Sequence, residues 1–549
     1  MQWYWLLIVG LLCATPIGRW GFRIAAVPFS AVARRPAWAV TAIFLLSLGL
    51  NSGLSLLVGL PDPVIHDEFS YLLAADTFAH GRLTNPTHPF WQHFESFHIF
   101  HQPTYMSKYP PGQGLALALG IVTFGHPIAG AWFATSAACA ALCWMLYAWV
   151  PPKWALLGGL LAASNPLILS WSQNYWGGSV ALLGAAVFTG AFRRAFDKPS
   201  ITQGILLGLG MTIFANSRPY EGAVFSFLMG VPLAAWGFGQ LRCGKVANVA
   251  RVASGAAGIL LLGAAWLGYY NYRVAGHPLR LAYTIHDSQY CITPHLLFQS
   301  LRPPPEYRHK EFVWFHTVNE AKYWHEQRTL RGWAAQALTE AHYTLVLFTQ
   351  PWQWMLGLSY VMLPLLLWRD PWMRLAVGII LLFIALALWP VTWPAYEFYA
   401  APVGGLLLVA LMRCMQAAWH SRIWNIPWGA IALRAAIGVA LLAPYRVCVG
   451  MQNWRQMNQN WFAPKRAQFE GRLEADGRKH LVIVRYGPNH SALWEWVYNR
   501  ADIDSAPVVW ARDMGPERNR QLLDYFKDRE VWLLTVDDTE YQWGPYPER

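Results

Sequence analysis

The adjacent acids Asp67 and Glu68 are the residues of this sequence that are best placed to do chemistry. They follow an apolar run, residues 38–60, that is long enough to cross a bilayer, so they come where water meets hydrocarbon. Two neighbouring carboxylates that repel each other and are partly desolvated should have at least one raised pKa. Ionisable groups with a displaced pKa are functional candidates. The alternative is an ordinary helix start at the edge of a solvated loop.

Four more clusters of polar and aromatic residues are expected on the same side of the membrane, each at the end of a predicted helix. They are residues 108–112, 173–178, 217–222 and 393–399. Together with the acidic pair they would converge on one cavity at the membrane surface. The candidate binding side chains are Lys108, Tyr109, Asn174, Tyr175, Arg218, Tyr220, Glu221 and Glu397, with His101 from the first loop.

Each of these clusters also has a simpler explanation. Lys108 would reach the lipid headgroups while its stem stays in apolar surroundings. Pro110–Pro111 would only interrupt a helix. Arg218 and Glu221 would form an i,i+3 ion pair, and Glu397 would be a satisfied interfacial residue.

Metal and disulfide chemistry have weaker support in the sequence. His88, His93, His98 and His101 lie in the first polar loop without the close spacing of a ligand set, so a divalent metal there is a minor alternative. The seven cysteines lie mainly in apolar segments and form no zinc or disulfide pattern. The sequence therefore identifies no cofactor, and a divalent metal remains the minor alternative.

The composition indicates a helical membrane protein. Of the 549 residues, 55% are hydrophobic and 13% charged, 32 are tryptophan, and the mean hydropathy is +0.24. The formal charge of +12 does not indicate nucleic-acid binding, because the basic residues lie mostly in short loops between apolar runs. Helical spans also exclude a location in the outer membrane, whose proteins are barrels.

The apolar runs predict about twelve spans. They cover residues 2–18, 38–60, 127–149, 154–171, 178–195, 200–217, 222–239, 252–271, 350–368, 373–392, 399–418 and 427–449. The arginines and lysines of the short loops then fall on one side, which predicts that side to be cytoplasmic. The first span follows no basic segment, so we expect a retained helix with its N-terminus outside.

Three longer segments then lie outside. Residues 61–126 end in an apolar stretch, 112–125, that is too short to span and should lie at the interface. Residues 272–349 should form short surface helices. Residues 450–549 read as strand 480–485, helix 491–499, strand 507–511, helix 517–527 and strand 531–536, a small α/β unit with a parallel sheet. The expected domains are therefore 1–449 and 450–549.

The stretch from Asp67-Glu68 to Lys108-Tyr109-Pro110-Pro111-Gly112 resembles the GT-C superfold of membrane glycosyltransferases. Within that superfold it is similar to protein O-mannosyltransferases, lipid A aminoarabinose transferases and the family named for rhizobial lipopolysaccharide galacturonic acid transferases. The topology through about residue 240 is also similar. The resemblance implies an all-α bundle with an active site and C-terminal domain on the outer face of the cytoplasmic membrane.

The resemblance also implies a reaction. A sugar would pass from a polyprenyl-phosphate donor to a hydroxyl group of a lipid, glycan or protein, with inversion. Asp67 would be the general base, Glu68 would orient the acceptor or tune Asp67, and Lys108 would contact the lipid phosphate. From its position, Arg218 would add a second contact to that phosphate.

One departure from the family concerns the next outer turn, where relatives often have a second acid. This sequence has Gln173 and Asn174 there, and a neutral amide cannot act as a base. Two-carboxylate chemistry and a metal requirement are therefore in doubt. A transporter or flippase of a lipid-linked glycan is the main alternative. It would be favoured by inverted repeats and by charged residues near the middle of the spans, where Arg434 is the only strongly placed charge. A non-catalytic envelope scaffold is a further alternative.

Overall fold

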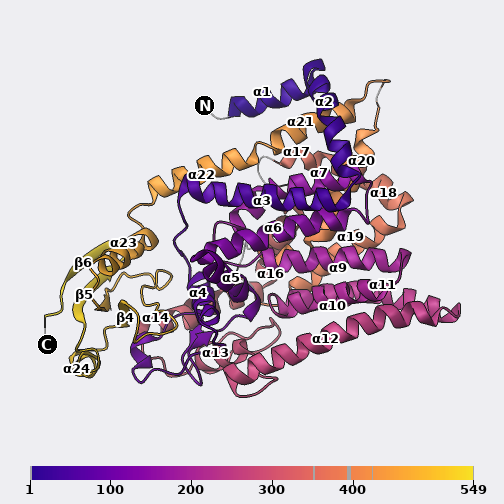
Figure 1. Ribbon diagram of the computed structural model, residues 1–549. Coiled ribbons are helices and arrows are strands. Elements are labelled where there is room, and N and C mark those ends of the chain that lie inside the picture. The colour runs from indigo at the N-terminus through magenta and orange to yellow at the C-terminus, as the bar shows by residue number, and fades with distance from the viewer. Residues whose placement is uncertain (1–2, 350–352, 392, 394–396, 423, 548–549) are drawn as a thin grey trace.

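The structure is a computed structural model that describes residues 3–349, 353–391, 393, 397–422 and 424–547. Long helices form a bundle, and a small tail containing a sheet lies at one end of it (Figure 1). Within the described chain, seven segments are long and apolar enough to cross a membrane, or eight if one bent pair of helices counts as a span. The chain is therefore a multi-pass helical membrane protein.

The seven segments coincide with seven of the predicted spans. They are α3 (Pro36–Val58), α6 (Pro127–Leu146), α9 (Ser179–Asp197), α11 (Pro219–Arg242), α12 (Val246–Ala275), η4 with α20 (Glu397–Val403, Gly404–Trp419) and α21 with α22 (Trp428–Ala440, Ala443–Met457). The predicted total of twelve is not confirmed. The α22 helix also runs through residue 450, where the sequence had suggested a domain boundary.

The other predicted spans are broken or short. The predicted span 2–18, whose residue 2 lies outside the described chain, divides between α1 (Trp3–Ala14) and α2 (Pro16–Ala33). The predicted span 154–171 divides between α7 (Pro152–Ala163) and α8 (Pro166–Trp171). The α10 helix (Ile201–Ala215) has 15 residues. In place of the spans 350–368 and 373–392, α17 (Trp354–Gly357), η3 (Leu358–Met362) and α18 (Leu363–Arg369) meet α19 (Pro371–Ala387) at 114°. Residues 350–352 and 392 of those predictions lie outside the described chain.

Three of these breaks have the same cause. Each new helix begins with a proline, and the side chain just before it, Thr15, Asn165 or Asp370, accepts a hydrogen bond from a backbone N–H of the first turn. Proline fits the first turn of a helix but ends a preceding one, and these residue types favour helix starts. The capping residue and proline at each break are visible in the sequence. The predicted spans ran across these breaks because they were based on hydropathy alone.

Glycine lets neighbouring helices of the bundle approach closely. The α10 helix packs against α9 and α12. A Cβ atom on Gly204 would lie 2.1 Å from the carbonyl oxygen of Val252, and one on Gly255 would lie 2.3 Å from that of Ile201. Close backbone approach of this kind drives helix association in lipid, where the hydrophobic effect does not.

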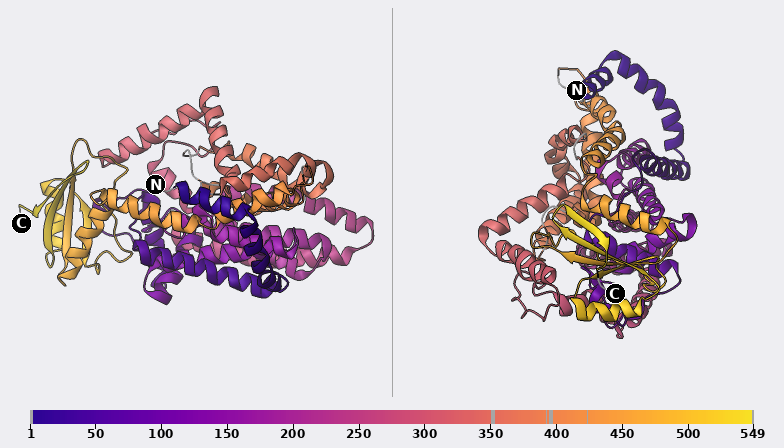
Figure 2. Two further views of the ribbon diagram at one scale, coloured as in Figure 1. Left: turned by 90° about the horizontal axis from the view of Figure 1, so that it is seen from above. Right: turned by 90° about the vertical axis from the view of Figure 1, so that its left-hand side faces the viewer.

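The two segments that were predicted to lie outside, residues 61–126 and 272–349, are called the outer segments here. They consist of short elements, most of which lie at the tail end of the bundle, while α16 (Leu330–Leu345) reaches between the long helices (Figures 1 and 2). The first contains α4 (His66–Ala79), η1 (Trp91–Phe94), β1 (Ile99–Phe100), β2 (Met106–Ser107) and α5 (Pro111–Phe124). The second contains α13 (Ala282–Tyr290), α14 (Lys310–Val313), the π-helical turn η2 (Trp314–Asn319), α15 (Glu320–Gln327) and α16 (Leu330–Leu345). Short helices in the second segment and a short apolar helix at 111–124 agree with the sequence prediction.

The tail contains a four-stranded sheet. Its elements are α23 (Phe462–Ala475), β3 (His480–Tyr486), β4 (Val508–Arg512), α24 (Pro516–Tyr525), β5 (Glu530–Asp537) and β6 (Glu540–Pro545). The strand order is β4-β3-β5-β6, with β3 parallel to β4 and to β5, and β6 antiparallel to β5. The parallel arrangement of the three predicted strands is confirmed, and the β6 edge strand was missed.

The predicted helix 491–499 is wrong, because other parts of the chain bind its backbone. Arg466 donates to the carbonyl oxygens of Trp496 and Tyr498, both at 2.9 Å. From the first outer segment, the Tyr105 hydroxyl donates to the carbonyl of Asn499 at 3.0 Å. These bonds replace those of a helix and hold the tail on the outer segment.

Candidate functional site

The site is built around the first turn of α4. Asp67 and Glu68 are the second and third residues of this helix, which begins at His66. Carboxylates in this position are favoured by the unpaired N–H groups and the dipole of the helix. The α4 helix lies at the tail end of the bundle, where the two outer segments and the tail meet (Figure 1).

Two side chains lie beside the Asp67 carboxylate. The Tyr109 hydroxyl donates a hydrogen bond to Oδ1 of Asp67. The Nε2 atom of His98 lies 3.8 Å from Oδ2 of Asp67. The Asp67 side chain remains 22% exposed, so a substrate can reach it, whereas the His98 side chain is 9% exposed. One oxygen is thus fixed by a tyrosine and the other faces an imidazole.

The β1–β2 hairpin presents His98 to Asp67. His98 immediately precedes β1 and has a φ of 62°, an unusual conformation for a residue other than glycine. Its carbonyl oxygen accepts hydrogen bonds from the hydroxyl of Ser70 at 2.7 Å and from the backbone N–H of Lys108 at 3.1 Å. The neighbouring residues therefore maintain the unusual backbone conformation, as is typical of functional sites.

Two cations act on the carboxylate. Lys108 lies with its Nζ atom 5.3 Å from the centre of the Tyr109 ring. The guanidinium carbon of Arg218 lies 4.5 Å from the centre of the Phe398 ring and 5.1 Å from that of Tyr399. Both cations interact electrostatically with Asp67. The structure thus brings together the Asp67, Lys108, Tyr109 and Arg218 side chains that the sequence had singled out.

Aromatic rings form one wall of the site. The rings of Tyr71 and Tyr109 stack with their centres 4.5 Å apart, and Tyr283 of α13 lies 5.7 Å from Tyr109. Sequence reasoning missed Tyr71, although it lies one helical turn after Asp67 and must share its face of α4. No sequence pattern pointed to Tyr283, because it belongs to the second outer segment, far along the chain from Asp67 and Tyr109.

The electrostatics suit a carboxylate that exchanges a proton. Burial raises the pKa of Asp67, while Lys108, the Tyr109 hydroxyl and Arg218 oppose that rise. Burial lowers the pKa of His98 well below its usual value, with Lys108 adding to the effect, so this imidazole is neutral at pH 7. Burial raises the pKa of Tyr109, which therefore remains a hydrogen-bond donor.

Glu68 joins separate segments and does not face the same space as Asp67. It is 1% exposed. Its Oε2 atom accepts a hydrogen bond from the backbone N–H of Val64 at 2.7 Å, and Oε1 accepts one from that of Tyr175 at 3.0 Å. Burial raises its pKa to about 7, against the effect of these amides. The geometry favours a positioning role, in which Glu68 fixes the start of α4.

The amide side chains at the next outer turn are also engaged by the protein itself. The Asn174 side chain accepts from the backbone N–H of Trp176 at 3.0 Å and donates to the carbonyl of Ser170, also at 3.0 Å. Gln173 donates to the carbonyl of Asn51 at 2.8 Å. The Tyr175 hydroxyl donates to the carbonyl of Pro61 at 2.8 Å. These bonds fix the turn whose Tyr175 N–H donates to Glu68.

The remaining candidates lie at different distances from the acidic pair. Glu221 lies near Arg218 and interacts with it electrostatically. The Tyr220 hydroxyl instead donates to the carbonyl of Leu386 in α19, at 3.0 Å. Glu397 begins η4 and is half-buried; residues 394–396 of its cluster lie outside the described chain. His101 is fully buried, with its ring stacked 4.8 Å from that of Tyr105.

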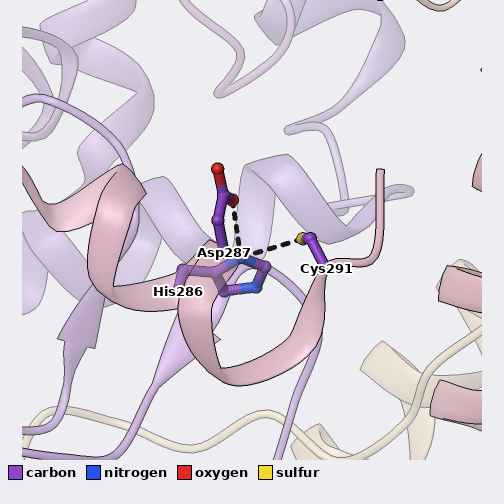
Figure 3. A group of neighbouring side chains, drawn as sticks. All are labelled: His286, Asp287 and Cys291. Atoms are coloured by element: carbon purple, nitrogen blue, oxygen red, sulfur yellow. Dashed lines mark hydrogen bonds and ion pairs between the residues drawn. The ribbon is translucent and has the colours of Figure 1, made fainter. Parts of the chain in front are cut away.

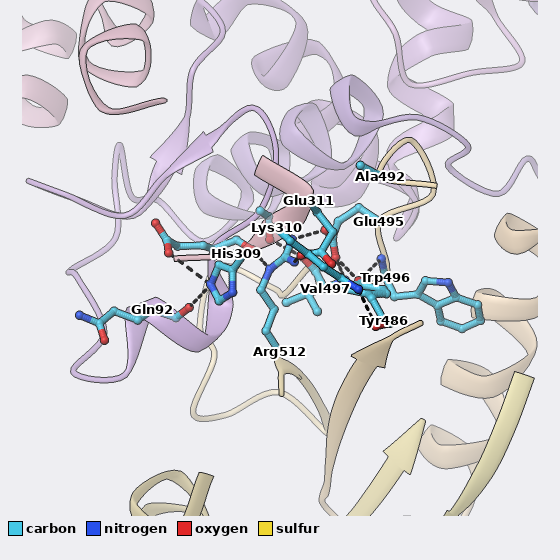
Figure 4. Close-up of polar contacts among 12 residues, drawn as sticks. Gln92, His309, Lys310, Glu311, Tyr486, Ala492, Glu495, Trp496, Val497 and Arg512 are labelled. Carbon is cyan, nitrogen blue, oxygen red and sulfur yellow. Dashed lines mark hydrogen bonds and ion pairs between the residues drawn. The ribbon is translucent and has the colours of Figure 1, made fainter. Parts of the chain in front are cut away.

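A buried arginine adds to the contacts that join the tail to this end of the molecule (Figure 4). Arg512 is 2% exposed. It donates to the backbone carbonyl of Glu95 at 2.8 Å, to the carboxylate of Glu311 at 3.2 Å, and to the carboxylate of Glu495. It thus joins both outer segments to the tail. No local sequence pattern predicts this network, because its residues are far apart in the chain.

Several solved structures are similar to this chain. ArnT from Cupriavidus metallidurans, bound to undecaprenyl phosphate, is 13% identical with a TM-score of 0.47, covering 93% of this chain and 92% of that chain. The apo Archaeoglobus fulgidus oligosaccharyltransferase is 10% identical with a TM-score of 0.44, covering 91% and 69%. The same enzyme tethered to an acceptor peptide is 11% identical with a TM-score of 0.46, covering 91% and 68%. No protein-family model and no curated protein matches the sequence. With TM-scores below 0.5, function has to be argued from the site itself.

Proposed function

We propose that this protein is a membrane glycosyltransferase of the GT-C type, which moves a sugar from a polyprenyl-phosphate donor to a hydroxyl acceptor. The observation that carries the proposal is a partly exposed carboxylate, Asp67, which accepts a hydrogen bond from Tyr109, has His98 beside it and lies within the field of two cations. Those are the groups that such a transfer needs: a base for the acceptor and positive charge for the departing phosphate. The acceptor is a lipid, glycan or protein.

In the proposed reaction Asp67 accepts the proton of the acceptor hydroxyl while that oxygen attacks the anomeric carbon. The bond between the carbon and the phosphate oxygen breaks, and its electron pair leaves with the lipid phosphate. A single displacement inverts the anomeric centre. Tyr109 holds the carboxylate in position by its hydrogen bond, and Glu68 holds the helix turn that carries it.

Lys108 and Arg218 are proposed to bind the lipid phosphate. A hydrogen bond to a charged group contributes about 1.5–3 kcal/mol. Replacing Lys108 by methionine should therefore lower kcat/KM for the donor by about tenfold to 150-fold. Initial rates at varied donor concentration would measure the change. Lys153→Met, which changes an exposed lysine at the start of α7, is the matched control and should leave the rate as it is. Equal rates for the two variants would remove Lys108 from the phosphate site.

The raised pKa of Asp67 predicts the acid limb of the pH profile. Protonated Asp67 cannot accept a proton, so kcat/KM should fall as the pH drops through a pKa above the usual aspartate value of about 3.9. The limb is measured as kcat/KM against pH. In Glu68→Gln the limb should remain, because Glu68 is a positioning residue here. Loss of the limb in that variant would assign it to Glu68, whose pKa is raised to about 7.

The test of the proposal uses purified protein in lipid vesicles with a panel of radiolabelled undecaprenyl-phosphate sugars and crude envelope acceptors. Loss of donor with appearance of a glycosylated acceptor of inverted anomeric configuration is the expected result. Transfer of intact labelled lipid across the bilayer, with no sugar released, would instead support a flippase. We place the reaction at the outer face of the cytoplasmic membrane, following the distribution of basic loops.

A further inference from the structure

A second group of reactive side chains lies behind the site, in the second outer segment. Asp287 and His286 belong to α13, and Cys291 directly follows that helix. His316 lies in η2, and Glu320 is the first residue of α15. The chain therefore folds back so that residues from two neighbouring elements face one another. None of these side chains has a role in the proposed glycosyl transfer.

The ligand atoms are as close as those of a metal site. The Nδ1 atom of His286 lies 3.7 Å from Sγ of Cys291 and 3.5 Å from Oδ1 of Asp287 (Figure 3). Zinc bonds of about 2.0 Å to nitrogen and 2.3 Å to sulfur put tetrahedral ligand atoms roughly 3.3–3.8 Å apart. Cys291 also belongs to a second group, with His316 and Glu320, in which the ligand atoms all lie within 4.8 Å of one another.

The cluster is closed to solvent. His286 and His316 are fully buried, and Asp287 and Cys291 are 7% and 8% exposed. The Nε2 atoms of both histidines are buried and have no hydrogen-bond partner in the described chain. The Nδ1 atom of His316 donates to the Glu320 carboxylate at 2.7 Å, which leaves its Nε2 atom as an acceptor without a partner among the described residues. Such a buried polar atom is costly unless a cation or ordered water satisfies it.

A nucleophilic role for Cys291 fits less well. Burial raises the pKa of the thiol well above its usual value, and the Glu320 and Asp287 carboxylates raise it further. A catalytic cysteine instead needs a lowered pKa and access for its substrate. A bound divalent cation has the opposite effect on the thiol and lowers its pKa, because the cation binds the thiolate form.

We propose that this cluster binds a structural Zn²⁺ ion through Cys291, His286 and Asp287, and that His316 or Glu320, whose ligand atoms lie within 4.8 Å of that of Cys291, moves to complete the tetrahedron. Mixed sulfur, nitrogen and oxygen ligands suit zinc. The exposed His295 donates to Asp287 across 2.7 Å and so orients that ligand from outside. The ion would tie α13 to η2 and α15. The His286 ring lies 6.0 Å from that of His98, so the ion would also stiffen the wall beside Asp67.

A third group, Asp476, His480 and Glu530 in the tail, serves as the internal comparison. Arg478 already pairs with both of its carboxylates, at 2.9 Å to Asp476 and also with Glu530. This arginine neutralises the charge that would attract a cation. We therefore expect no tight zinc binding in the tail.

The test uses full-length protein in detergent, treated with a chelator and then titrated with Zn²⁺ or Co²⁺ alone. We expect one tightly bound metal per chain by elemental analysis. The Co²⁺ form should show a thiolate charge-transfer absorption band, which needs no variant and does not depend on enzyme activity. Removing the metal should lower Tm.

Variants then locate the ion. Cys291→Ser should abolish the charge-transfer band, whereas Cys243→Ser, at an exposed cysteine, should leave it unchanged. His295→Ala should weaken binding by about 10–100-fold, because it removes an orienting partner, and its exposed position keeps the fold intact. No bound metal, a Co²⁺ spectrum without a thiolate band, or metal lost only in Asp476→Asn would each overturn the proposal. These readouts are independent of glycosyl transfer.

Discussion

Asp67→Asn is expected to reduce sugar transfer by about 10²–10⁴-fold, the range that one positioned general base contributes. Asparagine has nearly the same shape and can still accept a hydrogen bond from Tyr109, but it cannot accept the proton of an acceptor hydroxyl. The loss should appear in kcat, since the change removes an interaction made in the transition state. Single-turnover rates with a labelled donor would measure it.

Asp62→Asn is the matched control for this variant. Asp62 lies in the same outer segment, and its charged neighbour is Arg455, not the cations of the site. It should keep the wild-type rate, and both variants should elute as the native protein and bind donor. Full activity in Asp67→Asn would disprove the role of Asp67 as the base. Equal loss in both variants would point to a general effect of charge in this segment.

Arg512→Met is expected to destabilise the contact between the tail and the outer segments by about 3–5 kcal/mol, the usual result of leaving buried charges without their partner. The change leaves the carboxylates of Glu311 and Glu495 unpaired at positions that are 7% and 1% exposed. It also removes the hydrogen bond to the carbonyl of Glu95. A lower Tm and faster proteolysis of the tail would measure the effect.

Two further variants separate the buried charge network from a general loss of arginine. Arg485→Met removes a tail arginine whose side chain is 51% exposed and pairs with Asp513, so it should cost less than about 1 kcal/mol. Adding Glu311→Gln and Glu495→Gln to Arg512→Met should restore part of the lost stability, because it removes the unpaired charges. If Arg512→Met matched Arg485→Met, the network would not hold the tail in place.

Local pattern was sufficient for several elements. The apolar runs predicted seven spans correctly, and the alternation of strand and helix segments along residues 480–536 predicted the three parallel tail strands. Hydropathy did not resolve the breaks at Pro16, Pro166 and Pro371, although their capping residues were visible. The helix predicted at 491–499 failed for another reason: partners distant in the chain bind its backbone, and no local pattern contains them.

By itself, the sequence determined that this is a multi-pass helical membrane protein and that Asp67, Lys108, Tyr109 and Arg218 are the groups to examine. Apolar length and residue type are local properties, and a bilayer imposes its thickness on every span. Only the tertiary structure decided which of these groups meet, that Glu68 faces backbone amides, and that His98 and Tyr283 join Asp67 and its neighbours. Those contacts join segments that are far apart in the chain. The distances between these side chains depend on how the outer segments and the tail pack, and no local pattern specifies that packing.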